Sequence, residues 1–110
     1  MITGPYQQID PPRAEIDAIK GPLLLVFGRN DCGICQRTQP KLEAALAGQD
    51  WLQQIMIQDG QGHKLGRSFE VKLWPTLIFL LNGEELTRLV RPDSVGIIQV
   101  CFRQFGLTHP

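Results

Sequence analysis

The feature that most constrains the fold of this chain is a pair of cysteines separated by two residues. The pair stands at the junction of a predicted strand and a predicted helix. The cysteines are Cys32 and Cys35. Residues 23–27, an apolar run too short for a helix, precede them and predict a buried strand. Residues 36–47 follow, are rich in helix-forming residues, and end before Gly48, a typical helix stop. We therefore expect both cysteines to lie where a buried strand ends and a helix begins.

The start of a helix favours thiol chemistry. Unpaired backbone N–H groups and the positive end of the helix dipole stabilise negative charge there. We expect Cys32 to be the more exposed thiol, to ionise readily and to act as a nucleophile. Cys35 is close enough in the chain to attack a mixed disulfide formed at Cys32, which makes it the candidate resolving thiol.

A metal site is the alternative interpretation of the cysteine pair. Structural zinc and iron–sulfur sites usually take four ligands from Cys or His, so further donors would be required. The remaining donors in the sequence are Cys101, His63 and His109. Cys101 follows the spacing of one apolar helix face and is expected in the core, and His63 stands in a glycine-rich loop. We therefore predict no metal.

The composition sets limits on the class of protein. The 110 residues, 43% of them hydrophobic, suit one domain over 1–110 with a real core. Eleven basic residues balance eleven acidic ones without a basic stripe, which argues against a nucleic-acid partner. No apolar run approaches the ~20 residues that span a bilayer, so we expect no membrane association. Residues 1–6 do not resemble a secretory signal, and a cytoplasmic location follows as the expectation.

The order of predicted elements indicates an α/β fold with a mixed sheet. Asn82-Gly83 predicts a hairpin, because both residue types tolerate positive φ. The other expected elements are an edge strand at 6–9, a helix from Asp10-Pro11-Pro12 to Lys20-Gly21, a strand at 51–58, a short helix at 62–70, strands at 77–81 and 84–90, and a helix from Pro92-Asp93-Ser94 to Gly106.

Taken together, these motifs resemble the thioredoxin-like family over nearly the whole chain. The resemblance rests on the cysteine pair, Pro40, Pro75-Thr76, Asn82-Gly83-Glu84 and the terminal amphipathic helix, all in the family's order. It implies a thioredoxin-like fold with helices on both faces of the central mixed sheet. It also implies that Cys32 attacks, that Cys35 resolves, and that Pro75 follows a cis peptide bond facing the cysteines.

The resemblance further implies a substrate groove at Trp74, Pro75 and Thr76, where an extended substrate strand pairs with the backbone of residue 74. The indole of Trp74 has two possible roles. It either covers the disulfide and contacts the substrate, or it packs against the cysteine helix without a role in binding.

Two departures from the family pattern bear on reactivity. Asp31 stands where thioredoxins have tryptophan, and a carboxylate there opposes thiolate formation. Arg29 and Arg37 are the candidates to offset it. Gly33-Ile34 replaces the usual Gly-Pro between the cysteines, restores one N–H and is expected to change the redox potential.

A third departure affects the resolving step. The family's buried aspartate and its lysine partner correspond to Val26 and Ile55 here, so Cys35 loses its usual internal base. We expect resolution to depend on Asp31, water or the departing thiolate, and to be slower than in thioredoxin.

The predicted function is a thiol–disulfide oxidoreductase that acts on protein disulfides, with reduction as the expected direction. No bound cofactor is needed, because the dithiol carries both electrons. An external reductase or a low-molecular-weight thiol would reduce the oxidised protein again, and we expect the protein to be a monomer. One alternative is a glutathione-linked, glutaredoxin-like protein, for which the sequence displays no clear pocket. The other is a redox-active interaction module without multiple turnover.

Overall fold

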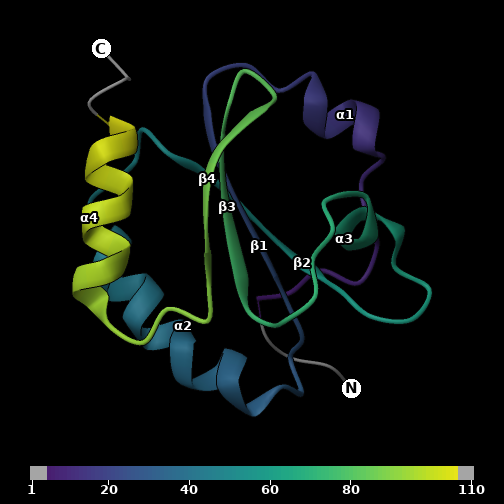
Figure 1. The fold of residues 1–110 in the computed structure, drawn as a ribbon, viewed down its shortest axis with the longest axis horizontal. Helices are drawn as coiled ribbons and strands as arrows, with labels where there is room; N and C mark the ends of the chain where they lie inside the picture. The colour runs from purple at the N-terminus through teal and green to yellow at the C-terminus, as the bar shows by residue number, and fades with distance from the viewer. Residues whose placement is uncertain (1–4, 107–110) are drawn as a thin grey trace.

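A four-stranded mixed sheet forms the centre of the molecule (Figure 1). The computed structural model describes residues 5–106, and the side chains of residues 5–104. The sheet order is β2-β1-β3-β4, with β1 parallel to β2 and antiparallel to β3, and β3 antiparallel to β4. The predicted α/β class is confirmed. The elements are α1 (Arg13–Asp17), β1 (Pro22–Gly28), α2 (Gly33–Leu46), β2 (Gln53–Gln58), α3 (Lys64–Ser68), β3 (Thr76–Leu81), β4 (Glu84–Val90) and α4 (Val95–Gly106).

Helices cover both faces of the sheet, with α2 and α4 on one side and α1 and α3 on the other (Figure 1). The central strand β1 is buried along its whole length, as its apolar run predicts. Because side chains alternate between the faces of a strand, β1 and β3 contribute to two separate cores. The first core contains Leu24 and Val26 and packs against α2 and α4, whereas the second contains Leu25 and Phe27 and packs against α1 and α3.

The hairpin forms at the predicted Asn82-Gly83 turn. Both residues have positive φ, 51° and 83°, as a tight two-residue hairpin turn requires. A side chain at Gly83 would collide with the backbone carbonyl of Asp17, so glycine is needed for space as well as for conformation. This turn therefore fixes the β3–β4 register and packs against the end of α1.

The N-terminal segment differs from its prediction. The edge strand expected at 6–9 is reduced to one parallel bridge between Gln7 and Ile57 of β2. The helix expected from Asp10 begins only at Arg13, and its N-cap residue Pro12 makes no side-chain cap bond. Asp10 instead accepts a hydrogen bond from the Leu65 N–H, at 3.0 Å, in the first turn of α3. Since the prolines hold the chain extended, the aspartate reaches a different helix from the one it precedes.

Smaller differences concern the bounds of the helices. The helix after the cysteines starts at Gly33, earlier than expected, so that Cys35 lies in its first turn. The helix predicted at 62–70 is only α3, and the strand predicted from residue 51 begins at Gln53. The last helix begins as predicted, with Ser94 Oγ accepting the Ile97 N–H at 3.1 Å. Within residues 5–106, no helix is long and apolar enough to cross a membrane.

Candidate active site

The two cysteines of the motif occupy different environments at the start of α2. Cys32 is the N-cap residue and is partly exposed, whereas Cys35 is 1% exposed. The Cys35 backbone N–H donates to the Cys32 sulfur at 3.2 Å. Both thiols are free. An accessible sulfur with a hydrogen-bond donor therefore lies beside a protected second sulfur.

The Cys35 thiol is held in its protonated form. Burial, and next the neighbouring Cys32 sulfur, raise the pKa of Cys35 to about 12. Hydrogen bonds from the Arg29 backbone and from the Tyr6 side chain act in the opposite direction. Cys35 is therefore a poor nucleophile at neutral pH unless its thiolate is stabilised.

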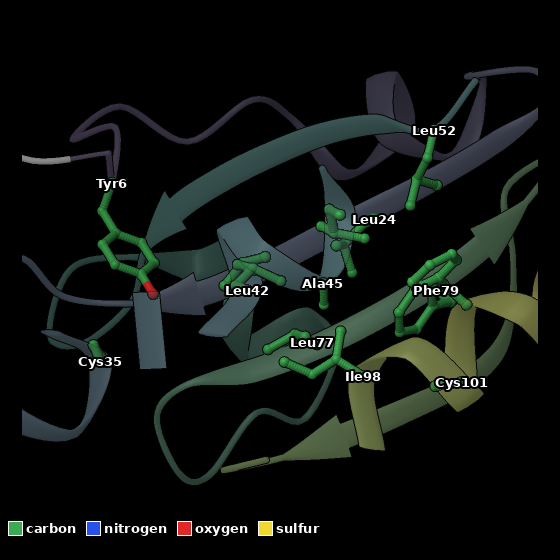
Figure 2. Close-up of a cluster of buried hydrophobic side chains, with 13 residues drawn as sticks. Tyr6, Leu24, Cys35, Leu42, Ala45, Leu52, Leu77, Phe79, Ile98 and Cys101 are labelled. Atoms are coloured by element: carbon green, nitrogen blue, oxygen red, sulfur yellow. The ribbon is translucent and has the colours of Figure 1, made fainter. Parts of the chain in front are cut away.

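Tyr6 is a site residue that the sequence reasoning missed. Its side chain is 5% exposed and belongs to the same buried cluster as Cys35. Figure 2 shows both residues at one end of this cluster, with the hydroxyl end of the ring on the side nearer to Cys35. A Cβ atom at Gly28 would lie 2.7 Å from the Tyr6 hydroxyl oxygen and 2.9 Å from the Cys35 sulfur. Gly28, which ends the apolar run, therefore leaves room for both groups. A glycine at the end of a buried strand is the sequence signal that could have indicated this close contact.

The backbone around Tyr6 is fixed by hydrogen bonds. The Tyr6 N–H donates to Asn30 Oδ1, and Asn30 Nδ2 donates to the Tyr6 carbonyl, both at 3.2 Å. The next residue, Gln7, donates to the Met56 carbonyl at 2.9 Å and accepts from the Gln58 N–H at 3.0 Å. The N-terminal segment is thus attached both to the loop before Cys32 and to the edge of the sheet.

Asp31 is exposed and paired with Arg29. Arg29 Nε donates to Asp31 Oδ1 at 2.9 Å. This hydrogen bond and the charge of the guanidinium lower the pKa of Asp31, which therefore remains ionised. Of the two arginines expected to offset Asp31, Arg29 makes this contact, whereas the guanidinium of Arg37 lies near Gly33.

Trp74 is anchored to the loop after β2. Its indole Nε1 donates to Asp59 Oδ2 at 2.8 Å, and Asp59 is buried, with 7% of its surface exposed. The Arg29 guanidinium lies 5.8 Å from the centre of the indole ring and donates to the Asp59 carbonyl at 3.0 Å. The carboxylate fits because Gly66 has no side chain, and a Cβ there would collide with it. The roles of Asp59 and Arg29 in holding Trp74 were not predicted.

The turn before β3 contains a cis peptide bond between Trp74 and Pro75. Thr76 is buried, and its hydroxyl donates to the Leu73 carbonyl at 2.6 Å. This side chain is therefore engaged within the turn, and a contact of Thr76 with a substrate stays a prediction. Arg91 binds the same turn: its Nε donates to the Trp74 carbonyl at 2.8 Å, and its N–H donates to the Pro75 carbonyl at 2.9 Å.

The floor beneath Cys35 is apolar, with one correction to its composition. Val26 lies in the same buried cluster as Cys35. In the parallel register Val26 pairs with Met56, which packs against that cluster. Ile55, the residue expected at this place, packs against the cluster on the opposite face. The predicted register was wrong by one residue, and a one-residue shift moves a side chain to the other face of a strand.

The described residues show no cluster of three or more His, Cys, Asp or Glu side chains able to hold a metal ion. His63 instead pairs with Asp10, with 2.9 Å between Nδ1 and Oδ1. Cys101, on α4, is buried in the cluster on the α2 and α4 face of the sheet, as its spacing predicts. His109 and the side chain of Phe105 lie outside the part of the chain that the structure describes.

Comparison with known proteins gives a consistent picture, although no family model matches the chain. The sequence is 31% identical over 93 residues to a thioredoxin of Echinococcus granulosus, covering 83% of this chain and 86% of that protein. The structure is similar to that of reduced thioredoxin 2 from Pseudomonas aeruginosa PAO1, with 40% identity, a TM-score of 0.83, and coverage of 92% and 94%. A mutant thioredoxin from Halobacterium salinarum NRC-1 shares the fold, with 22% identity, a TM-score of 0.73, and coverage of 91% and 88%.

Proposed function

The chain belongs to the thioredoxin family, and on this basis we propose that it reduces protein disulfides with Cys32 as the attacking thiol and Cys35 as the resolving thiol. Thiol–disulfide exchange is the activity of its relatives, and the close cysteine pair fits it. The observation that supports the assignment of roles is the asymmetry of the pair. The partly exposed Cys32 sulfur is open to a substrate, whereas Cys35 is protected until a mixed disulfide forms.

The proposed reaction has two exchange steps. The Cys32 thiolate attacks one sulfur of the substrate disulfide, forms a new S–S bond with it, and releases the other sulfur as a thiolate. Cys35 then loses its proton and attacks the Cys32 sulfur, which forms the intramolecular disulfide and releases the second substrate thiolate. The substrate gains two electrons and two protons, and the dithiol is oxidised. An external reductase or a small thiol then returns the two electrons, so the cycle requires no bound cofactor.

We place the substrate groove beside Trp74 and Pro75. Leu73 and Val90 are about half exposed, and Val90 pairs with Thr76 at the start of β3. An extended substrate segment would meet apolar surface on this side of the cysteines, with the Arg91 guanidinium on the Trp74 carbonyl. Such a groove would accept apolar side chains flanking the substrate cysteine.

The proposed setting is the cytoplasm, with the protein acting as a monomer. A reducing compartment keeps a redox-active cysteine pair and a third free thiol, Cys101, in the reduced form. Light scattering on the reduced protein tests the monomer, and localisation of the native protein in cell fractions tests the compartment.

Turnover with a protein disulfide tests the function. Wild type and a Cys101→Ser control should turn over repeatedly with dithiothreitol as electron donor. Cys32→Ser should be inactive, and Cys35→Ser should accumulate a mixed disulfide at Cys32. Repeated turnover by Cys32→Ser would overturn the assignment, and one reduction per molecule of wild type would indicate an interaction module.

The redox potential tests the direction of electron flow. A two-electron transition between about −270 and −200 mV supports a reductant, whereas a value near −120 mV indicates an oxidant. The titration is made in thiol/disulfide buffers, with alkylation and mass spectrometry as the readout.

A further inference from the structure

The resolving step poses a chemical problem that the apolar floor makes acute. Cys35 must become a thiolate to attack Cys32, yet it is buried in the apolar cluster that includes Val26 and against which Met56 packs, where the family has a charged pair. Desolvation disfavours the thiolate, and so does the neighbouring Cys32 sulfur. A group that binds the Cys35 thiolate is therefore needed.

We propose that the Tyr6 hydroxyl donates a hydrogen bond to the Cys35 sulfur and stabilises its thiolate during the resolving step. This inference rests on the proposed roles of Cys32 and Cys35. The geometry that carries it is the shared space above Gly28, where the hydroxyl oxygen and the sulfur both lie within 3 Å of a single Cβ position. The hydroxyl of a tyrosine is a donor as well as an acceptor, so it can turn its proton towards a developing negative charge.

Tyr6 acts as a donor and not as a base. Burial, followed by the adjacent Cys35 sulfur, raises the pKa of Tyr6, so the phenol keeps its proton at neutral pH. The groups that face Cys35 are the Tyr6 hydroxyl from the N-terminal segment, the Cys32 sulfur from the start of α2, and the Arg29 backbone from the preceding loop. Among these three, Tyr6 supplies the side chain that favours the thiolate.

The proton released by Cys35 has a route to solvent. An open pocket of about 260 Å³ borders both Tyr6 and Cys35, and Asn30, Gln36 and Gln39 are among the residues that line it. The balance of the step is simple: the Cys35 S–H bond breaks, the Cys35–Cys32 bond forms, and the Cys32–substrate bond breaks. The proton passes to water, and the departing substrate thiolate takes one up.

The position of Tyr6 is built into the fold. The paired hydrogen bonds with Asn30 fix its backbone, and the bridge at Gln7 fixes the next residue to β2. The hydroxyl therefore remains near the sulfur without an ordering cost at the moment of reaction.

A Tyr6→Phe variant tests the proposal, because it keeps the ring and removes only the hydroxyl. Reduced protein in a Cys101→Ser background is mixed with one equivalent of dithionitrobenzoate in a stopped-flow instrument. Attack by Cys32 releases the first thionitrobenzoate, and attack by Cys35 releases the second. Thr38→Val is the matched control, since its buried hydroxyl lies in the same helix but donates to the Ile34 carbonyl at 2.8 Å.

Tyr6→Phe should keep the rate of the first thionitrobenzoate release within about twofold of the wild-type rate. It should slow the second release roughly 3- to 15-fold at neutral pH. This range follows from the typical strength of a hydrogen bond to a charged group, about half offset by the greater nucleophilicity of a more basic thiolate. The pH profile of the second release should also move to higher pH, and Thr38→Val should change neither. A second release that is unchanged in rate and pH profile would overturn the role of Tyr6.

A second measurement covers the case in which the second release is too fast to time. In a Cys32→Ser background, the rate of Cys35 alkylation is followed against pH by peptide mass spectrometry. Tyr6→Phe should shift this profile to higher pH, and an unshifted profile would contradict the proposal. If the wild-type protein forms no Cys32–Cys35 disulfide at all, the proposed function fails. If the disulfide forms in Tyr6→Phe at the wild-type rate, only the role of Tyr6 fails.

Discussion

Replacing Trp74 with phenylalanine should destabilise the protein by about 2 kcal/mol, because a hydrogen bond to a charged group contributes roughly 1.5–3 kcal/mol. The substitution removes the indole N–H that binds Asp59 Oδ2 at 2.8 Å, and the Asp59 residue is only 7% exposed. Water therefore has little access to take the place of the lost donor. For a chain of 110 residues the unfolding entropy is about 0.23 kcal/mol/K, so the expected fall in melting temperature is about 9 °C.

Scanning calorimetry of the reduced protein measures this effect, and Trp51→Phe provides the matched control. The Trp51 indole donates to Gln49 Oε1, a neutral acceptor, at 2.7 Å. A neutral hydrogen bond contributes only about 0.5–1.5 kcal/mol, so the control should lose less stability. Equal melting temperatures for the two variants would refute the reasoning that the buried Asp59 carboxylate depends on Trp74.

Three further predictions concern packing and protonation. The reduced protein should lose stability above about pH 9, because Cys35 and Cys101 have raised pKa values and keep their protons when folded, whereas the unfolded chain loses them. The free energy of unfolding should fall by up to about 1.4 kcal/mol per pH unit for each thiol. A urea midpoint that does not change with pH above this value would contradict the prediction. Gly28→Ala should cost about 1–3 kcal/mol and slow the second thionitrobenzoate release, because its methyl group would enter the space shared by the tyrosine hydroxyl and the sulfur; an unchanged release rate would count against that crowding. Gly83→Ala should lower the melting temperature more than Gly48→Ala, since both glycines have positive φ but only the former meets backbone within 4 Å; equal losses would show that conformation alone matters.

Much of the fold could be predicted because its signals are local. The apolar run of β1, the Asn82-Gly83 turn and the spacing of α4 each reflect residues within a few positions of one another. The two cysteines are also local, since three positions in one helical turn place Cys35 beside Cys32. These features needed no knowledge of how distant segments pack.

The parts that could not be predicted depend on contacts between distant residues. Tyr6 is held by Asn30, 24 positions away, and Asp10 caps a helix 55 positions away. A lone tyrosine near a proline has the same local pattern whether it lies in the core or on the surface. The partner of Val26 was misplaced for a related reason, because an error of one position in the strand register selects the opposite face of the sheet.

The attachment of residues 5–9 to the fold makes Cys35 a natural reporter of local unfolding. This segment is joined to the edge of the sheet at Gln7 and to the loop before Cys32 by the two Asn30 hydrogen bonds, and it carries the ring that packs in the same cluster as Cys35. A short segment held by a few hydrogen bonds still opens more often than a whole domain unfolds. A slow alkylating reagent acting on Cys35 would therefore count the openings of this segment, and its rate would reveal the free energy that keeps the N-terminal segment in place.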